Sequence, residues 1–187
     1  MFVPATQLKV GNVIKYNNDL CRVTQLTHIT PGNWRGMVQT KMRNMRTGLS
    51  TENRFRSEDK VEKITLEQHE MEFLYKEGEV FHFMNTENYE QVELSKEDLG
   101  DGVGFLTPNL KVSVEFHEDK PLGVELPKTV DLKVIEVVPG MKQATVTNVL
   151  KPATTETGLV VQVPNHVETG SVIRVDTESG NYLSRAK

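Results

Sequence analysis

Short strand-like segments separated by turn residues recur along almost the whole sequence, and this pattern most limits the folds the chain can adopt. Apolar and polar residues alternate with a period of two in segments such as 37–43, 110–116 and 130–138, as in half-buried β-strands. Glycine and asparagine turns separate such segments at intervals of about ten residues. The pattern predicts an all-β protein built from sandwiches or small closed barrels.

Turn residues make this prediction more specific in two segments, and one short segment carries a helix signal. Residues 17–19, Asn-Asn-Asp, predict a hairpin between two strands, and residues 73–94 predict a three-strand meander. Ser95 is followed three residues later by Asp98, which predicts a capping box and one or two helical turns. Gly100 and Gly102 are expected to end that helix quickly.

The chain of 187 residues is long for one continuous barrel of this kind, and two features divide it. Composition shifts near residue 64, and a proline-marked connector lies near Pro127. The predicted domains are therefore residues 1–64, 65–128 and 129–187, and the size of each suits one SH3-like or OB-like barrel.

Charge is distributed unevenly over these three parts. Residues 1–64 hold 11 Lys and Arg against 5 Asp and Glu, residues 65–128 hold 5 against 15, and residues 129–187 hold 6 against 6. Nucleic acid binds to local basic surface, so the net charge of −4 for the whole chain does not argue against a basic binding surface in one part of it. The N-terminal third is thus the candidate for nucleic-acid contact. The acidic middle suits a basic partner or serves solubility.

Several function classes find no support in the residues. No apolar run approaches the roughly 20 residues of a membrane span, no signal peptide is recognised, and the expected location is the cytoplasm. Cys21 alone cannot form an internal disulfide or a cysteine zinc cluster. His69 with Glu70 fits a solvated surface better than a metal site, and Gly100–Gly104 lacks the Lys-Ser/Thr of a phosphate loop. We therefore expect no catalytic residues, no metal and no cofactor.

The segment from His28 to Lys41 carries the strongest functional signal. It joins a Pro-Gly turn to the only tryptophan of the chain and an arginine, with strand-like residues on both sides. We expect Trp34 to stack on a base or ribose and Arg35 to meet phosphate, as in recognition of unpaired RNA. The alternative is that Trp34 folds back onto its barrel. The predicted tip residues and their supporting basic face are Pro31, Gly32, Asn33, Trp34, Arg35 and Gly36, with Lys41, Arg43 and Arg46.

Three segments, taken in order, resemble the bacterial elongation factor P family. "TPGNWRGMVQTKMRNMRTG" resembles the family's tip hairpin, and "YKEGEVFHFMNTENYEQVEL" resembles its middle-domain meander. The segment from Lys151 to Lys187 is similar to the family's C-terminal signature, in particular "TG…V.VP…V.TG..I.VDT.SG.Y.SR". The similarity covers the whole chain.

The resemblance implies an SH3-like (KOW-like) N-terminal domain with a tip hairpin, followed by two OB-fold domains, in an L-shaped, tRNA-like arrangement. It implies a non-enzymatic, monomeric factor that binds the ribosome between the peptidyl and exit sites. There it would position peptidyl-tRNA for peptide-bond formation when ribosomes stall on consecutive prolines. The implied partners are the ribosome and peptidyl-tRNA, with no membrane.

The chain departs from the family pattern at two places. Well-known members carry a modified Lys or Arg directly after the Pro-Gly of the tip, where this chain has Asn33. We expect the tip to work unmodified, although Arg35 is an alternative target. Many members have a Gly-Asp pair in a third-domain loop that contacts the exit-site codon. This chain has Gln143, Ala144 and Thr145 there, which puts that contact in doubt.

Two other functions remain open from the sequence. One is a paralogue of elongation factor P that prefers a different stall. The other is a general RNA-binding module built from OB-folds, which calls for aromatics interleaved with basic residues on the OB strands. The acidic or neutral charge of residues 65–187 argues against the second alternative.

Overall fold

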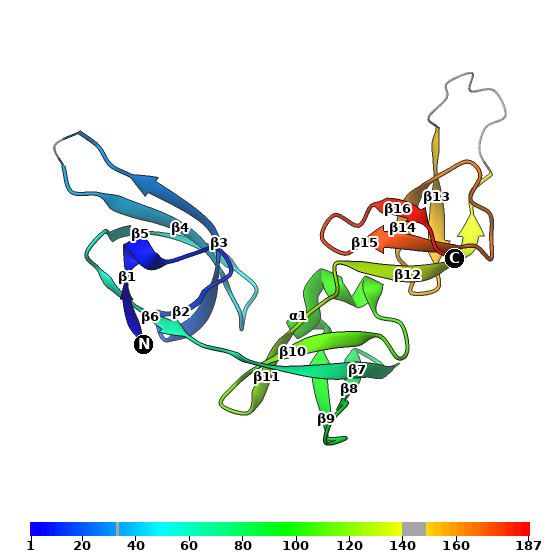
Figure 1. Ribbon diagram of the computed structural model, residues 1–187, viewed down its shortest axis with the longest axis horizontal. Coiled ribbons are helices and arrows are strands. Elements are labelled where there is room, and N and C mark those ends of the chain that lie inside the picture. Colours follow the sequence, from blue (N-terminus) through cyan, green and yellow to red (C-terminus); the bar gives the residue numbers. More distant parts are fainter. Residues whose placement is uncertain (33, 140–148) are drawn as a thin grey trace. The chain divides into compact units, whose positions relative to one another are not determined.

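A computed structural model describes residues 1–32, 34–139 and 149–187 and confirms the all-β prediction. Figure 1 shows three β-sheets that follow one another along the chain. Within the described residues the only α-helix is α1 (Lys96–Leu99), and 3₁₀ turns occupy Ala5–Gln7 and Gly100–Phe105.

The first sheet has the strand order β1-β6-β2-β3-β4-β5. The predicted hairpin at residues 17–19 is confirmed: Tyr16 pairs with Asp19, and Asn17 and Asn18 adopt left-handed φ angles of 49° and 64°. Asparagine tolerates this conformation better than most residues do. The six strands are β1 (Phe2–Pro4), β2 (Val13–Tyr16), β3 (Asp19–Ile29), β4 (Met37–Asn44), β5 (Ser50–Arg56) and β6 (Lys60–Ile64).

Alternation decides which face of the first sheet is buried. Val38, Thr40 and Met42 of β4 are each 0% exposed, whereas the residues between them are exposed or half-buried. The hydroxyl of Thr40 is satisfied because its Oγ1 donates to the carbonyl oxygen of Asn53, at 3.0 Å. The apolar core below this face also includes Ile14 and Val23 from neighbouring strands.

The second sheet has the order β11-β10-β7-β8-β9, and the predicted meander is its β7-β8-β9 part. Phe73 and Phe83 are buried in it with their ring centroids 5.4 Å apart. The capping box at the start of α1 is confirmed, since Ser95 Oγ accepts from the Asp98 N–H and the Asp98 carboxylate accepts from the Ser95 N–H. The strands are β7 (Glu67–Glu77), β8 (Val80–Asn85), β9 (Gln91–Ser95), β10 (Lys111–His117) and β11 (Lys120–Glu125).

The third sheet has the order β14-β13-β12-β15-β16 and buries side chains such as Leu132, Val163 and Ile173 completely. Phe105, which precedes the sheet by more than 20 residues, belongs to the same apolar cluster. Its neighbour Gly104 accepts a hydrogen bond from Thr157 Oγ1. The strands are β12 (Thr129–Val137), β13 (Leu150–Thr155), β14 (Val160–Pro164), β15 (Val172–Asp176) and β16 (Tyr182–Arg185).

The glycine-rich stretch at residues 100–104 therefore has a structural role. A Cβ atom at position 104 would lie 3.3 Å from Leu159 Cδ1, and one at position 102 would lie 3.3 Å from Leu126 Cδ1. Both distances are shorter than most contacts that real Cβ atoms make. Glycine here allows the 3₁₀ turn to pack closely on leucines of the segments that follow it.

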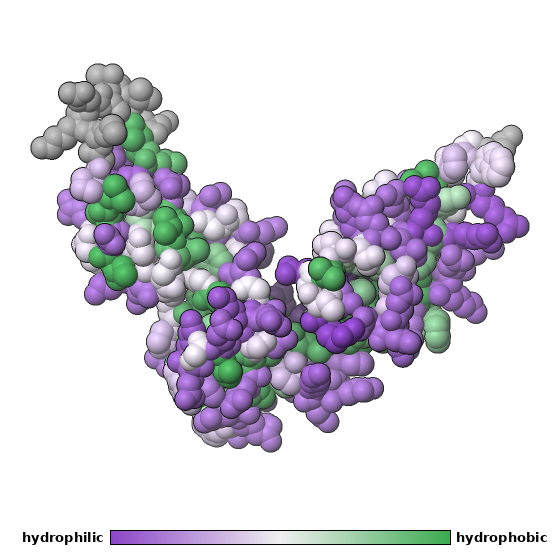
Figure 2. Space-filling view, turned by 180° about the vertical axis from the view of Figure 1, so that it is seen from behind, coloured by the Kyte–Doolittle hydropathy of each residue, from purple (hydrophilic) through white to green (hydrophobic). Residues whose placement is uncertain are grey.

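Contacts within the chain define two compact units. One comprises Met1–Gln68 with Phe116–Leu122, and the other comprises His69–Glu115 with Gly123–Lys187. Figure 2 shows a largely hydrophilic surface on which apolar side chains are scattered. In the described part of the chain, no helix has the length and apolar character needed to cross a membrane.

Candidate nucleic-acid interface

The hairpin of β3 and β4 extends beyond the core of the first sheet. Cys21 and Val23 of β3 are buried, whereas every residue from Thr24 to Ile29 is exposed or half-buried. A register shift between Val23 and Gln25 marks a bulge, at which Thr24 Oγ1 donates to the Lys41 carbonyl oxygen at 3.1 Å. Bulges bend a strand and increase its twist. Beyond the bulge, Val38 and Thr40 of β4 remain buried in the core. The hairpin leaves the core only past its last strand pair, Ile29 with Met37, and there its tip enters solvent (Figure 1).

The tip is a tight turn that presents an indole to solvent. The Trp34 N–H donates to the Pro31 carbonyl oxygen at 2.9 Å, and Gly32 has a left-handed φ of 44°. Trp34 exposes 80% of its surface, and Arg35 beside it is exposed as well. The indole does not fold back onto the barrel. Asn33, predicted as part of this tip, lies outside the described residues.

Gly36 attaches the base of the tip to the turn between β5 and β6. The Ser57 N–H donates to the Gly36 carbonyl oxygen at 3.0 Å. A Cβ atom at position 36 would lie 2.6 Å from Ser57 Oγ, a distance that forces the hydroxyl to move. Glycine permits this close approach. The tip is therefore held by two chain segments rather than by its own hairpin alone.

The outer face of the hairpin is basic, and the third strand, β5, makes it more so. Lys41 and Arg43 project from β4 and are exposed, as predicted. The register of β4 with β5 places Arg54 opposite Gln39 and Arg56 opposite Met37, next to the tip, and both arginines are exposed. Residues directly opposite in antiparallel strands project from the same face. Arg54 and Arg56 are thus on the face of Lys41 and Arg43.

Sequence reasoning missed Arg54 and Arg56, although a signal was present. Residues 50–56 alternate, so that Glu52, Arg54 and Arg56 share one face of a strand. Only the pairing with β4 shows that this face continues the basic face of the hairpin. Glu52 offsets part of the charge, because its carboxylate lies 3.3 Å from Lys41 Nζ.

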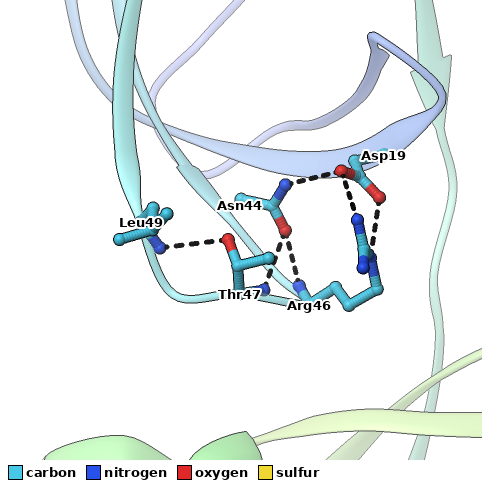
Figure 3. A network of polar contacts seen from close by, with 5 residues as sticks. All are labelled: Asp19, Asn44, Arg46, Thr47 and Leu49. Carbon is cyan, nitrogen blue, oxygen red and sulfur yellow. Dashed lines mark hydrogen bonds and ion pairs between the residues drawn. The ribbon is translucent and has the colours of Figure 1, made fainter.

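Arg46 does not lie behind the tip, and this part of the prediction is wrong. It follows the end of β4 that is remote from the tip, and its guanidinium makes two 2.9 Å hydrogen bonds to the Asp19 carboxylate (Figure 3). Asn44 Nδ2 donates to the same carboxylate at 2.9 Å, and Asn44 Oδ1 accepts from the N–H groups of Arg46 and Thr47. These bonds to Arg46 and Asn44 hold the pKa of Asp19 below its ordinary value. Arg46 thus joins the turn between β4 and β5 to the first residue of β3.

The other residues considered as possible functional sites in the sequence are not arranged as a site within the described residues. Gln143, Ala144 and Thr145 lie outside the described residues. Cys21 is buried in the first core, and burial raises the pKa of its thiol. His82 stacks on Tyr75 with ring centroids 4.4 Å apart. Residues 1–32, 34–139 and 149–187 hold no group of three or more His, Cys, Asp or Glu side chains able to bind a metal ion.

Comparisons with known proteins give one family match for each of the three sheets. Family models match residues 4–61 (elongation factor P KOW-like domain), 66–124 (elongation factor P OB domain) and 130–185 (elongation factor P, C-terminal). Elongation factor P of Acidobacterium capsulatum is 51% identical over 186 residues, and that of Gemmatimonas aurantiaca is 44% identical over 187 residues. In both cases 100% of each chain is covered.

One solved structure extends the similarity at the level of the fold. Eukaryotic translation initiation factor 5A from Methanococcus jannaschii aligns with a TM-score of 0.54 at 19% identity. The alignment covers 68% of this chain and 92% of that one. A likeness at this identity concerns the arrangement of strands alone.

Proposed function

The chain belongs to the elongation factor P family of translation factors, and on that premise we propose how it acts on the ribosome. It binds between the peptidyl- and exit-tRNA sites and promotes peptide-bond formation where ribosomes stall on consecutive prolines. Its partners are the ribosome and peptidyl-tRNA, and it works in the cytoplasm as a monomer that is not itself an enzyme.

The observation that carries this proposal is the exposed tip of the β3–β4 hairpin. Trp34 offers a flat aromatic face that is 80% exposed, and Arg35 offers a guanidinium directly beside it. Unpaired nucleotides are recognised by aromatic stacking and by arginine contacts to phosphate. The acceptor end of peptidyl-tRNA is such a single strand. The tip holds it in a reactive geometry, and the ribosome carries out the chemistry.

The basic outer face of β4 and β5 supports this contact, with Arg56 nearest the tip and Arg43 at the remote end of β4. Lys41, Arg43, Arg54 and Arg56 lie on one face of β4 and β5. Their charges attract the phosphate backbone from a distance and fix its register without reading sequence. The hydrogen bond from Ser57 to Gly36 ties the base of the tip to the turn that follows β5. Positioning by a rigid support is what a factor without chemistry of its own needs.

The tip works without a covalent modification. Asn33 has neither the amine nor the guanidinium that a modified Lys or Arg provides. Trp34 and Arg35 supply stacking and charge directly. Intact mass of the protein purified from its native source tests this, and the expected value is that of the sequence. An added mass mapped to Arg35 would overturn it.

Translation of polyproline reporters tests the function. In an extract depleted of the endogenous factor, the purified protein is expected to restore full-length product from reporters with three consecutive prolines and to leave proline-free reporters unchanged. Absence of rescue would refute the assignment. Rescue confined to a different stalling sequence, tested in a panel of reporters, would instead identify a paralogue with another preference.

A further inference from the structure

A second candidate site lies at the other end of the first sheet. A shallow, open pocket of about 430 Å³ is formed where β1, β6 and the β2–β3 turn meet. From this turn the 11 residues of β3 lead to the tip of the β3–β4 hairpin. At about 3.3 Å per residue this strand is roughly 35 Å long. The pocket is therefore separate from the tip. The lining residues that matter below are Phe2, Lys15, Asn17, Asn18, Lys60 and Glu62.

Strand register places an aromatic ring and two lysines on the same side of this pocket. Glu62 of β6 lies opposite Phe2 of β1 and opposite Lys15 of β2, and Lys60 lies opposite Pro4. Because opposed residues share a face and alternate residues of one strand do so too, Phe2, Lys15, Lys60 and Glu62 project together.

These side chains are open to solvent. Phe2 exposes 67% of its surface, and both lysines are exposed. Among the residues that the structure describes, neither lysine forms an ion pair, although Glu62 is close in register. The left-handed Asn17 and Asn18 at the rim are exposed as well, so their amides can donate and accept hydrogen bonds.

We propose that this pocket binds an unpaired ribonucleotide of an RNA strand. The base stacks on Phe2, and the flanking phosphates meet Lys15 and Lys60. The amides of Asn17 and Asn18 bond the edge of the base, and the Glu62 carboxylate accepts from a ribose hydroxyl. A flat ring with two cations and few aliphatic side chains suits a nucleotide better than a protein segment. This inference does not depend on the proposed action of the tip.

Binding of a fluorescein-labelled single-stranded RNA of eight uridines, followed by anisotropy at low salt, tests the proposal. Phe2→Ala is expected to weaken binding about tenfold, the loss of one stacked base. Lys15→Ala with Lys60→Ala is expected to reduce the slope of log K against log salt by about 1.4, since each single-strand phosphate contact contributes about 0.7. The control pair, Lys96→Ala with Lys128→Ala, removes the same charge from exposed positions elsewhere.

A fluorescent reporter locates the bound RNA. In a protein that carries Trp34→Phe and Phe2→Trp, the only indole is in the pocket, and stacking of uridine is expected to quench it. Thermal melts check that each variant folds. If the control pair loses as much affinity and salt dependence as the lysine pair, or if RNA leaves the indole at position 2 unquenched, the pocket is not an RNA site. Absence of any RNA binding by the unmodified sequence refutes it equally.

Discussion

Replacing Trp34 by alanine is expected to impair rescue of stalled ribosomes strongly and to affect stability little. The indole is 80% exposed, so folding removes only about one-fifth of its surface from water. A fully buried aromatic side chain covers about 150–250 Å², and a fifth of that is roughly 40 Å². At about 25 cal/mol per Å² this amounts to ~1 kcal/mol of unfolding free energy, which is an upper limit.

The expected functional loss is larger. A base stacked on an aromatic ring contributes about 1–3 kcal/mol, which corresponds to roughly 5- to 150-fold in affinity. The factor concentration needed for half-maximal rescue should therefore rise at least fivefold or so. Trp34→Phe keeps a flat apolar ring and is expected to retain most of the rescue.

Reconstituted translation of a polyproline reporter at limiting factor concentration measures rescue, and urea unfolding measures stability. Tyr89→Ala is the matched control, because Tyr89 is also an exposed aromatic, at 71%, but lies in the loop between β8 and β9. A stability loss of the 3–5 kcal/mol typical of buried aromatics would show that the indole packs against the protein. Unchanged rescue by Trp34→Ala, or equal damage from Tyr89→Ala, would refute the role of the tip.

Three further predictions concern other parts of the chain. Arg54→Ala with Arg56→Ala should weaken ribosome binding, measured by co-sedimentation, and lower its salt dependence because two cations leave the basic face. Phe105→Ala should reduce the unfolding free energy by about 3–5 kcal/mol in urea titrations, because the ring is only 6% exposed within the core of the third sheet. Asp19→Asn should destabilise the protein near pH 6 but progressively less as the pH falls below 4 in urea melts.

The sign of the pH effect follows from the lowered pKa of Asp19. Arg46 and Asn44 bond the ionised carboxylate, so the folded state holds its proton less tightly than the unfolded state does. The contribution is complete above the unfolded pKa of about 3.9 and is lost as the pH falls through the folded value. Asp101→Asn, at an exposed carboxylate, serves as control. A difference between Asp19→Asn and the unaltered protein that is the same at pH 6 and pH 3 would contradict this account.

The arginine pair and Phe105 each have a control substitution. Lys96→Ala with Lys128→Ala removes two charges outside the first sheet and should leave ribosome binding nearly unchanged. For Phe105, the change to leucine keeps most of the apolar volume and should cost clearly less than the change to alanine. Equal costs for both changes would mean that Phe105 does not fill the core of the third sheet.

Local residue patterns determined which side chains are buried and where the turns lie in several parts of this protein. The period-two alternation in β4 assigned Val38, Thr40 and Met42 to the buried face and Lys41 and Arg43 to the exposed face. Turn residues located the β2–β3 hairpin and the capping box of α1. These features follow from sequence because side-chain direction and turn conformation depend on neighbours a few residues away. The tip was recognisable for the same reason.

Only the tertiary structure decided which distant residues share a surface. Strand pairing brought Arg54 and Arg56 beside the tip, whereas it joined Arg46 to Asp19 at the opposite end of the hairpin. Packing placed Phe105, from the segment after α1, in the core of the third sheet. Alternation tells which face a side chain takes but not which strand lies alongside or in what register. Those choices depend on contacts between residues far apart in the chain, which the local pattern does not contain.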